Sequence, residues 1–156
     1  MVAQIAQAFQ KSGGDLRQVY KALLACEEAW ERPQSKFKTP QDYVLSIYRG
    51  LDLPVAERAD SILPFETLGQ RQFSPGSPAG WPDRSADWDG SSSLMKRIEY
   101  VDALSQALSS LPKVADLGPQ LLGATYTDET RTSISRAASA AQALTLLLTS
   151  PEFLRR

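Results

Sequence analysis

Apolar residues recur every three or four positions along most of the chain, and this spacing predicts amphipathic α-helices. The first predicted helix covers residues 2–11 and ends at Ser12-Gly13-Gly14, where glycines interrupt the pattern. Asp15 then precedes a second apolar stripe and is placed to cap its helix. That stripe is formed by Leu16, Val19, Tyr20, Leu23 and Leu24. No segment shows a convincing strand pattern, so the sequence predicts an all-α fold.

The later helices are marked by start and stop residues. Thr39 supplies a capping hydroxyl, Pro40 suits the first helical position, and Gly50 ends that helix. Further helical segments are expected at about 55–68 with a bend at Pro64, at 94–111, at 113–122, and as one long helix at 127–149. The prediction is an irregular bundle of about six helices in a single domain, residues 1–156.

The centre of the chain, residues 69–93, lacks helical periodicity. It holds four of the nine glycines, three of the ten prolines and two of the three tryptophans. Loops longer than about 15 residues in a compact domain tend to be functional or disordered. Because Trp81 and Trp88 can each bury a large area, we expect this loop to be ordered and attached to the helices.

Composition narrows the classes of function. The 17 Lys and Arg against 18 Asp and Glu give a net charge of -1, which offers no general attraction to nucleic acid. The longest strongly apolar run, residues 143–148, is far shorter than the roughly 20 residues of a membrane span. The chain contains no histidine and a single cysteine, Cys26, and no complete catalytic or metal-ligand set is recognisable. We therefore expect no cofactor, no metal, no nucleic-acid partner and no membrane span.

The central loop carries the candidate ligand or interaction residues, which are Gln70, Trp81, Asp83, Trp88 and Asp89. Two tryptophans with nearby carboxylates could stack on a sugar ring and hydrogen-bond its hydroxyls. The alternative, which the sequence favours, is that both indoles fold back onto the helices and hold the loop in place.

Two further ion sites have weaker support. The stretch that begins at Ser85 follows the first half of an EF-hand loop, but serine replaces the first acid and Lys96 stands where the closing glutamate belongs. Turn capping or ion pairs are therefore favoured over calcium binding. Lys36 and Lys38, just before the helix predicted at residue 39, could help a helix N-terminus hold an anion. A solvated basic turn is the favoured interpretation.

Several short motifs occur in an order that resembles a known bacterial family. They are Ser12–Leu16 leading into Ala22–Leu24, Gly69-Gln70 with Phe73, Ser77–Asp83, Trp88, the helix around Leu94 to Arg97, and Leu147–Phe153 with its Ser-Pro-Glu-Phe ending. Together they resemble the C-terminal third of the family described as domain of unknown function 1800. Cys26-Glu27 stands where this family favours Ser-Pro, and Ala29 stands where it favours Phe.

The resemblance implies a mostly helical protein that is several hundred residues long in full, with an export signal at a distant N-terminus in many members. It implies no activity, so no catalytic residue is carried over. The first helix starts without a capping residue, as a chain cut from a longer protein would. We therefore expect a C-terminal fragment, and an exported or periplasmic location through the resemblance only.

Two hypotheses about function follow. The first is a non-catalytic helical structural and interaction module, which packs against the missing N-terminal part of the same protein or against another protein. The second is part of a polysaccharide-acting envelope enzyme, or a carbohydrate-binding module, that uses the loop of Trp81 and Trp88 to hold a glycan. The sequence favours the first, with no enzymatic activity expected of this chain alone.

Overall fold

The structure of the chain, a computed structural model, describes residues 1–31, 36–54, 62–108 and 110–156. Within these residues it contains eight α-helices and one isolated β-bridge, between Phe37 and Arg155, which confirms the predicted all-α fold. The chain divides into two compact units, Met1–Ser35 (unit 1) and Lys36–Arg156 (unit 2). A single domain over residues 1–156 stays a prediction.

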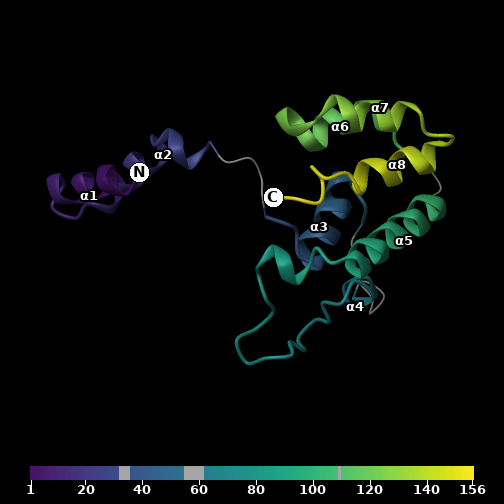
Figure 1. Cartoon of the computed structure of the whole chain (residues 1–156), viewed down its shortest axis with the longest axis horizontal. Helices are drawn as coiled ribbons and strands as arrows, with labels where there is room; N and C mark the ends of the chain where they lie inside the picture. Colours follow the sequence, from purple (N-terminus) through teal and green to yellow (C-terminus); the bar gives the residue numbers. More distant parts are fainter. Residues whose placement is uncertain (32–35, 55–61, 109) are drawn as a thin grey trace. The chain divides into compact units, whose positions relative to one another are not determined.

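Unit 1 is a hairpin of two helices, α1 (Val2–Lys11) and α2 (Leu16–Leu24), followed by a 3₁₀ turn at Glu27–Ala29 (Figure 1). Gly13 and Gly14 have φ angles of 64° and 89°. This left-handed conformation is easily adopted by glycine and lets the chain reverse direction between the two helices.

Side-chain contacts define the start of α2 and join its end to α1. Asp15 caps α2 as predicted, because its carboxylate accepts a hydrogen bond of 2.9 Å from the Arg17 N–H. The single S–H of Cys26 has two acceptors within reach, Gln4 Oε1 at 3.0 Å and the Ala22 carbonyl at 3.1 Å, and the contact with Gln4 joins α1 to the end of α2. Within the described part of unit 1, Cys26 is the one fully buried residue.

Unit 2 contains the other six helices of the described residues. They are α3 (Pro40–Gly50), α4 (Leu63–Thr67), α5 (Ser91–Ala107), α6 (Val114–Leu122), α7 (Asp128–Ser135) and α8 (Ala140–Leu148). Helix α8 lies between α5 and α7 (Figure 1). It supplies the centre of the core, since Leu144, Leu147 and Leu148 are completely buried there. No helix in the described ranges is long and apolar enough to cross a membrane.

Helix α3 packs its buried face into the same core. Thr39 and Asp42 form the capping box that begins it, with Thr39 Oγ1 accepting from the Asp42 N–H at 3.2 Å. Tyr43 and Ile47 are completely buried, and the Tyr43 hydroxyl donates to the Leu148 carbonyl at 3.0 Å. This bond satisfies a carbonyl at the C-terminal end of α8 and fixes α3 to it.

Three predicted helices differ from the structure. The helix predicted at 94–111 is α5, which ends at Ala107 because the backbone of Leu108 is extended, with φ -69° and ψ 125°. The long helix at 127–149 is divided into α7 and α8, because Ser139 caps α8 by accepting from the Gln142 N–H at 3.1 Å. This cap outweighs the helix propensity of the alanines around it. Pro64 lies in the first turn of α4, where proline is tolerated, rather than at a bend. Residues 55–61 of that predicted segment lie outside the described residues.

Candidate functional site

Gln70 attaches the start of the central loop to the start of α3. Its side chain is buried, and Oε1 accepts a hydrogen bond of 2.7 Å from the Gln41 N–H. Gln41 lies in the first turn of α3, where backbone N–H groups have no partner within the helix. Gln70 therefore completes the cap of α3 from a position 29 residues away along the chain.

The two loop tryptophans pack against each other, with ring centroids 6.1 Å apart and ring planes inclined by 49°. Trp88 is 6% exposed, and its indole N–H donates to the Pro82 carbonyl at 2.9 Å. Trp81 is half-buried against the core of unit 2. This arrangement favours a role in holding the loop in place, and sugar binding by the two rings stays a prediction.

Asp83 belongs to a chain of ion pairs on the surface of unit 2. Its carboxylate pairs with Lys36 Nζ and, at 3.2 Å, with Arg156 Nη2, while Arg156 Nη1 reaches Asp42 Oδ1, also at 3.2 Å. The hydrogen bond from Lys36 lowers the pKa of Asp83. Exposed ion pairs contribute little to stability individually. Their effect here is to link the loop to the segment before α3 and to the last turn.

Asp87 and Asp89, the other acids of the loop, are exposed. Asp87 pairs with Arg84 Nε at 3.4 Å, whereas no described residue forms a hydrogen bond or an ion pair with the Asp89 side chain. Across the described ranges, no three histidine, cysteine or acidic side chains gather where they could hold a metal ion. The structure thus gives Asp87 a local ion pair and leaves Asp89 on the surface.

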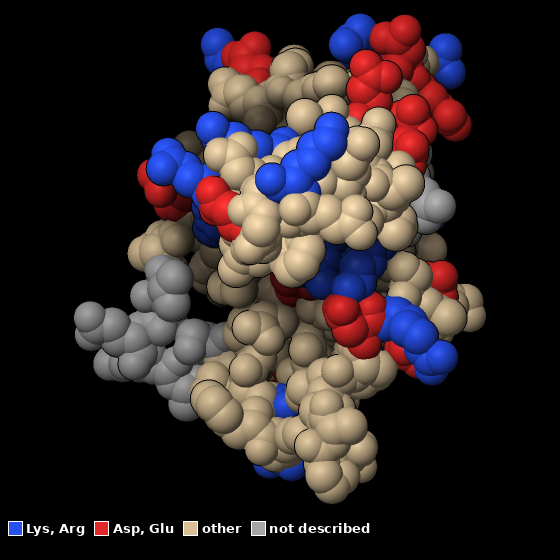
Figure 2. All heavy atoms as spheres, turned by 90° about the vertical axis from the view of Figure 1, so that its left-hand side faces the viewer, with Lys and Arg blue, Asp and Glu red and all other residues tan. Residues whose placement is uncertain are grey.

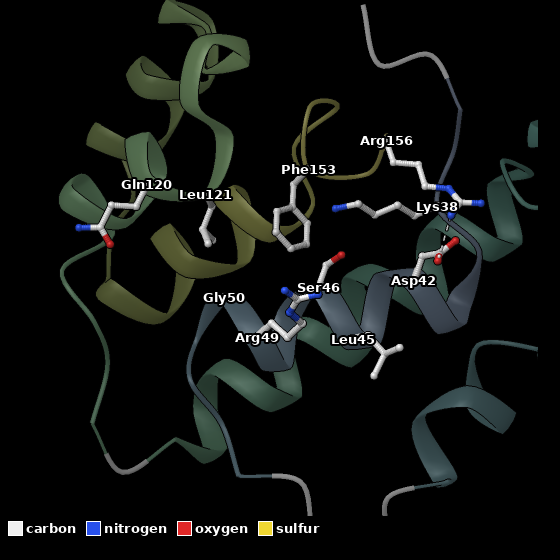
Figure 3. A pocket seen from close by; sticks show the side chains of 10 residues that line it. All are labelled: Lys38, Asp42, Leu45, Ser46, Arg49, Gly50, Gln120, Leu121, Phe153 and Arg156. Atoms are coloured by element: carbon white, nitrogen blue, oxygen red, sulfur yellow. Dashed lines mark hydrogen bonds and ion pairs between the residues drawn. The ribbon is translucent and has the colours of Figure 1, made fainter. Parts of the chain in front are cut away.

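A hollow of about 550 Å³, here named the α3 pocket, opens beside α3, α6 and the turn after α8 (Figure 3). Three basic side chains reach it, which are Lys38 ahead of α3, Arg49 within α3, and Arg156. Asp42 is the one acid among the described residues that line it. The other lining residues are Leu45, Ser46, Gly50, Gln120, Leu121 and Phe153. The α3 pocket therefore combines an excess of positive charge with an apolar wall.

Lys38 is half-buried in this pocket rather than part of a fully solvated turn. Its Nζ lies 4.1 Å from the centroid of the Phe153 ring. Burial lowers the pKa of Lys38 to about 8, because apolar surroundings disfavour the charged ammonium. No described residue accepts a hydrogen bond from Nζ, so its donors remain free to bind another group.

A buried guanidinium supports Lys38 from inside the fold. Arg97 of α5 is 1% exposed and lies over the rings of Phe37 and Tyr43, at 4.4 and 4.8 Å from their centroids. Its Nη2 donates to the Lys38 carbonyl at 2.7 Å, while Nη1 is buried without a hydrogen-bond partner among the described residues. Burial lowers the pKa of Arg97 to about 10. Arg97 therefore holds the backbone of Lys38 and places a second positive charge behind it.

The Ser-Pro-Glu-Phe motif builds the turn that presents Phe153 to the pocket. Ser150 Oγ accepts from the Phe153 N–H at 3.2 Å. The Glu152 carboxylate accepts hydrogen bonds from the hydroxyls of Thr127 and Thr130, the latter at 2.8 Å. Because Thr127 is the N-cap of α7, Glu152 ties this turn to the start of that helix.

Sequence reasoning did not single out Arg49, Arg97 or Arg156 as members of a site. The position of Arg97 carried a signal, since it lies four residues before Val101 and eight before Ser105, on the same side of a helix. Arg49 and Arg156 carried none, because their meeting at one pocket depends on the fold.

A family model described as protein of unknown function (DUF1800) matches residues 1–155. This match confirms the resemblance inferred from the motifs, whereas a place at the C-terminal end of a longer protein stays a prediction. No curated protein and no solved structure matches the chain.

Proposed function

The chain belongs to the DUF1800 family of proteins of unknown function, and we propose that it is a non-catalytic helical module that binds a partner polypeptide. Its docking surface is the outer face of unit 1, formed by apolar side chains of α1 and α2. The exposure of this face carries the proposal. The exposed fractions are 77% for Val2, 51% for Phe9, 56% for Leu16, 58% for Tyr20 and 62% for Leu24.

The shape of unit 1 suits the reception of another helix. Ile5 of α1 and Val19 of α2 are half-buried, whereas the five apolar side chains given above are more than half exposed. An apolar hollow of about 520 Å³ lies on the same unit and is lined by Val2, Ile5, Ala6, Phe9, Gln10 and Val19. Side chains of a partner helix pack into hollows of this kind.

The charges of the hairpin indicate the chemistry of the partner. Helices α1 and α2 themselves contain Lys11, Arg17 and Lys21 and no acidic residue, while Asp15 lies in the turn between them and Glu27 and Glu28 follow α2. Figure 2 shows uncharged surface with both basic and acidic side chains on the face turned toward the viewer. A second copy of these two helices, packed face to face, would bring their basic side chains together. The surface therefore suits a different polypeptide whose apolar helical face is bordered by Asp and Glu.

Energetics favour covering this face. Units of fewer than about 40 residues rarely bury enough apolar surface to be stable by themselves, and the described part of unit 1 fully buries one residue, Cys26. Covering an exposed Leu or Phe side chain contributes about 1.5–3 kcal/mol. A partner that covers several such side chains at once gains a large driving force for binding.

Photo-cross-linking in the full chain tests the proposal. The photoreactive residue p-benzoylphenylalanine replaces Tyr20 on the apolar face, or Gln18 on the opposite side of α2 as the matched control. We expect the probe at Tyr20 to cross-link to an amphipathic helix of a partner that has acidic residues beside its apolar positions. The probe at Gln18 should not cross-link to that helix.

Binding of the purified partner then tests the contact itself. Leu16→Glu should weaken binding at least about tenfold, because it places a charge in an apolar contact, and Gln18→Glu should leave it unchanged. Cross-links between copies of this chain alone, or an equal loss of binding for the two variants, would contradict the proposal. A lower melting temperature of the free chain in Leu16→Glu would also contradict it, since the face would then already be covered within residues 1–156.

A further inference from the structure

We propose that the α3 pocket binds a small organic oxyanion, a carboxylate or a phosphate ester carried on an apolar or ring-shaped body. The site lies within unit 2 and does not depend on the docking surface of unit 1. The inference depends on two features of this hollow of about 550 Å³ (Figure 3). One is a pair of cations that no acidic side chain of the described residues neutralises, and the other is an apolar wall.

Lys38 and Arg49 form the cationic side of the pocket. Neither forms an ion pair with any described residue. In Figure 3 the Lys38 side chain extends toward Phe153, the Arg49 guanidinium approaches from α3, and the Ser46 hydroxyl lies between them in this view. Carboxylates and phosphates accept hydrogen bonds from donors of these three kinds, an ammonium, a guanidinium and a hydroxyl.

The acid in the pocket is already bound elsewhere. Asp42 Oδ2 accepts from the Thr39 N–H at 3.3 Å and from the Thr39 hydroxyl at 2.8 Å, as part of the α3 cap. Its other oxygen, Oδ1, pairs with Arg156 at 3.2 Å. These contacts engage both oxygens of the carboxylate and leave the charges of Lys38 and Arg49 available to a ligand.

Arg97 strengthens the positive potential at this point. Its guanidinium is completely buried and is held to the Lys38 carbonyl, so its charge has a fixed position behind the pocket. Charges inside a protein are screened less than charges on its surface. An anion in the pocket would therefore interact favourably with three cations, of which Lys38 and Arg49 are within its reach.

The apolar wall selects the body of the ligand. Leu45, which is 44% exposed, and the half-buried Leu121 form the part of this wall that solvent reaches, whereas the Phe153 ring is 3% exposed and lies under the Lys38 ammonium. A bare inorganic ion would leave this wall in contact with water. A ligand with a ring would cover the wall while its acid group reaches the cations.

Nuclear magnetic resonance titrations of the full chain at constant ionic strength test the site. Benzoate and phenyl phosphate supply both the ring and the charge, inorganic phosphate supplies the charge alone, and benzyl alcohol supplies the ring alone. We expect the two ring-bearing anions to shift the amide signals of residues 38–50 and 153 and to bind at least about tenfold tighter than either control. Their relative affinities distinguish a carboxylate ligand from a phosphate ester.

Three variants assign the binding to the pocket. Lys38→Met and Arg49→Met keep the aliphatic stems and remove the charges, and each should weaken benzoate binding about tenfold. Arg136→Met removes an exposed charge outside the pocket lining and should leave the affinity unchanged. Because Arg49 is exposed, its variant tests the site even if Lys38→Met fails to fold. The proposal is overturned if benzyl alcohol binds as tightly as benzoate, if neither anion shifts these signals, or if all three variants bind alike.

Discussion

The two units carry the same kind of apolar stripe and place it in different surroundings. In unit 2, Tyr43 of α3 and Leu144 of α8 are completely buried, whereas in unit 1 Leu16 and Tyr20 of α2 are each more than half exposed. The stripes are equally regular in the sequence. Periodicity therefore identifies the face of a helix that is suited to burial, but it does not say what covers that face. In unit 2 the cover comes from helices far apart along the chain.

The largest expected effect separates the buried stripe from the exposed one. Leu144→Ala leaves a cavity in the core of unit 2 and should lower the free energy of unfolding by about 3 kcal/mol. Leu16→Ala makes the same change at an exposed site of unit 1 and should alter it by less than about 0.5 kcal/mol. Urea unfolding followed by far-ultraviolet circular dichroism measures both values. Equal losses would show that the two stripes are covered to the same extent.

A second contrast compares a buried arginine with an exposed one. Arg97→Ala removes packing against Phe37 and Tyr43 and leaves the Lys38 carbonyl without its donor. The substitution also removes the cost of burying a charge that has no ion-pair partner among the described residues, and this gain offsets part of the destabilisation. The expected net decrease in the free energy of unfolding is therefore about 2 kcal/mol. Arg17→Ala in unit 1 should change it by less than about 0.5 kcal/mol. Urea unfolding of both variants is the measurement, and a more stable Arg97→Ala chain would contradict the structural role given to this guanidinium.

Local features of the fold were predicted well because they depend on neighbouring residues. Asp15 and Thr39 cap helices as expected, since a cap is formed with an N–H two or three residues ahead. The break at Ser139 was missed, because the alanines on both sides favour a continuous helix. The burial of Arg97 was missed because arginine is rarely buried without a partner. The carbonyl that it binds is 59 positions away in the sequence.

The same limit applies to the site. The place of Lys38 ahead of α3, which is a local property, suggested an anion ligand, but a solvated basic turn was the favoured interpretation. The burial of Lys38 against Phe153 was not predictable, because the ring comes from the far end of the chain and is positioned by the turn after α8. For Gln70, the sequence suggested a ligand or interaction residue. In the structure its side-chain oxygen accepts a hydrogen bond from the backbone of α3, a partner that the sequence did not indicate.

A third prediction concerns this attachment of the loop. Gln70→Ala leaves the Gln41 N–H at the start of α3 without its acceptor and should lower the free energy of unfolding by about 1 kcal/mol. Gln18→Ala, at an exposed position of unit 1, is the matched control and should have no measurable effect. Thermal unfolding measures the difference. If Gln70→Ala is as stable as the control, the loop is held by Trp88 and its neighbours without help from Gln70.

The smallest expected effect compares a half-buried lysine of unit 2 with an exposed lysine of unit 1. Burial lowers the pKa of Lys38 from its usual 10.5 to about 8. Below pH 8 the folded and unfolded chains both hold this proton, and the cost of a buried ammonium is fully present. Above pH 8 the folded chain releases the proton while the unfolded chain keeps it, so the free energy of unfolding rises with pH. The rise should stay below about 1 kcal/mol, because Lys38 is only half-buried.

The window for this measurement is set by the groups around Lys38. Asp42, Arg97 and Arg156 are the charged groups that face it. Burial lowers the pKa of Arg97 to about 10 and raises that of Tyr43, so unfolding is best measured between pH 7 and about 9.5, before either contributes. Lys38→Met should abolish the rise, while Lys21→Met in unit 1 should retain it. A rise that persists in Lys38→Met would assign the titration to another group and would mean that the ammonium above Phe153 is as well solvated as Lys21.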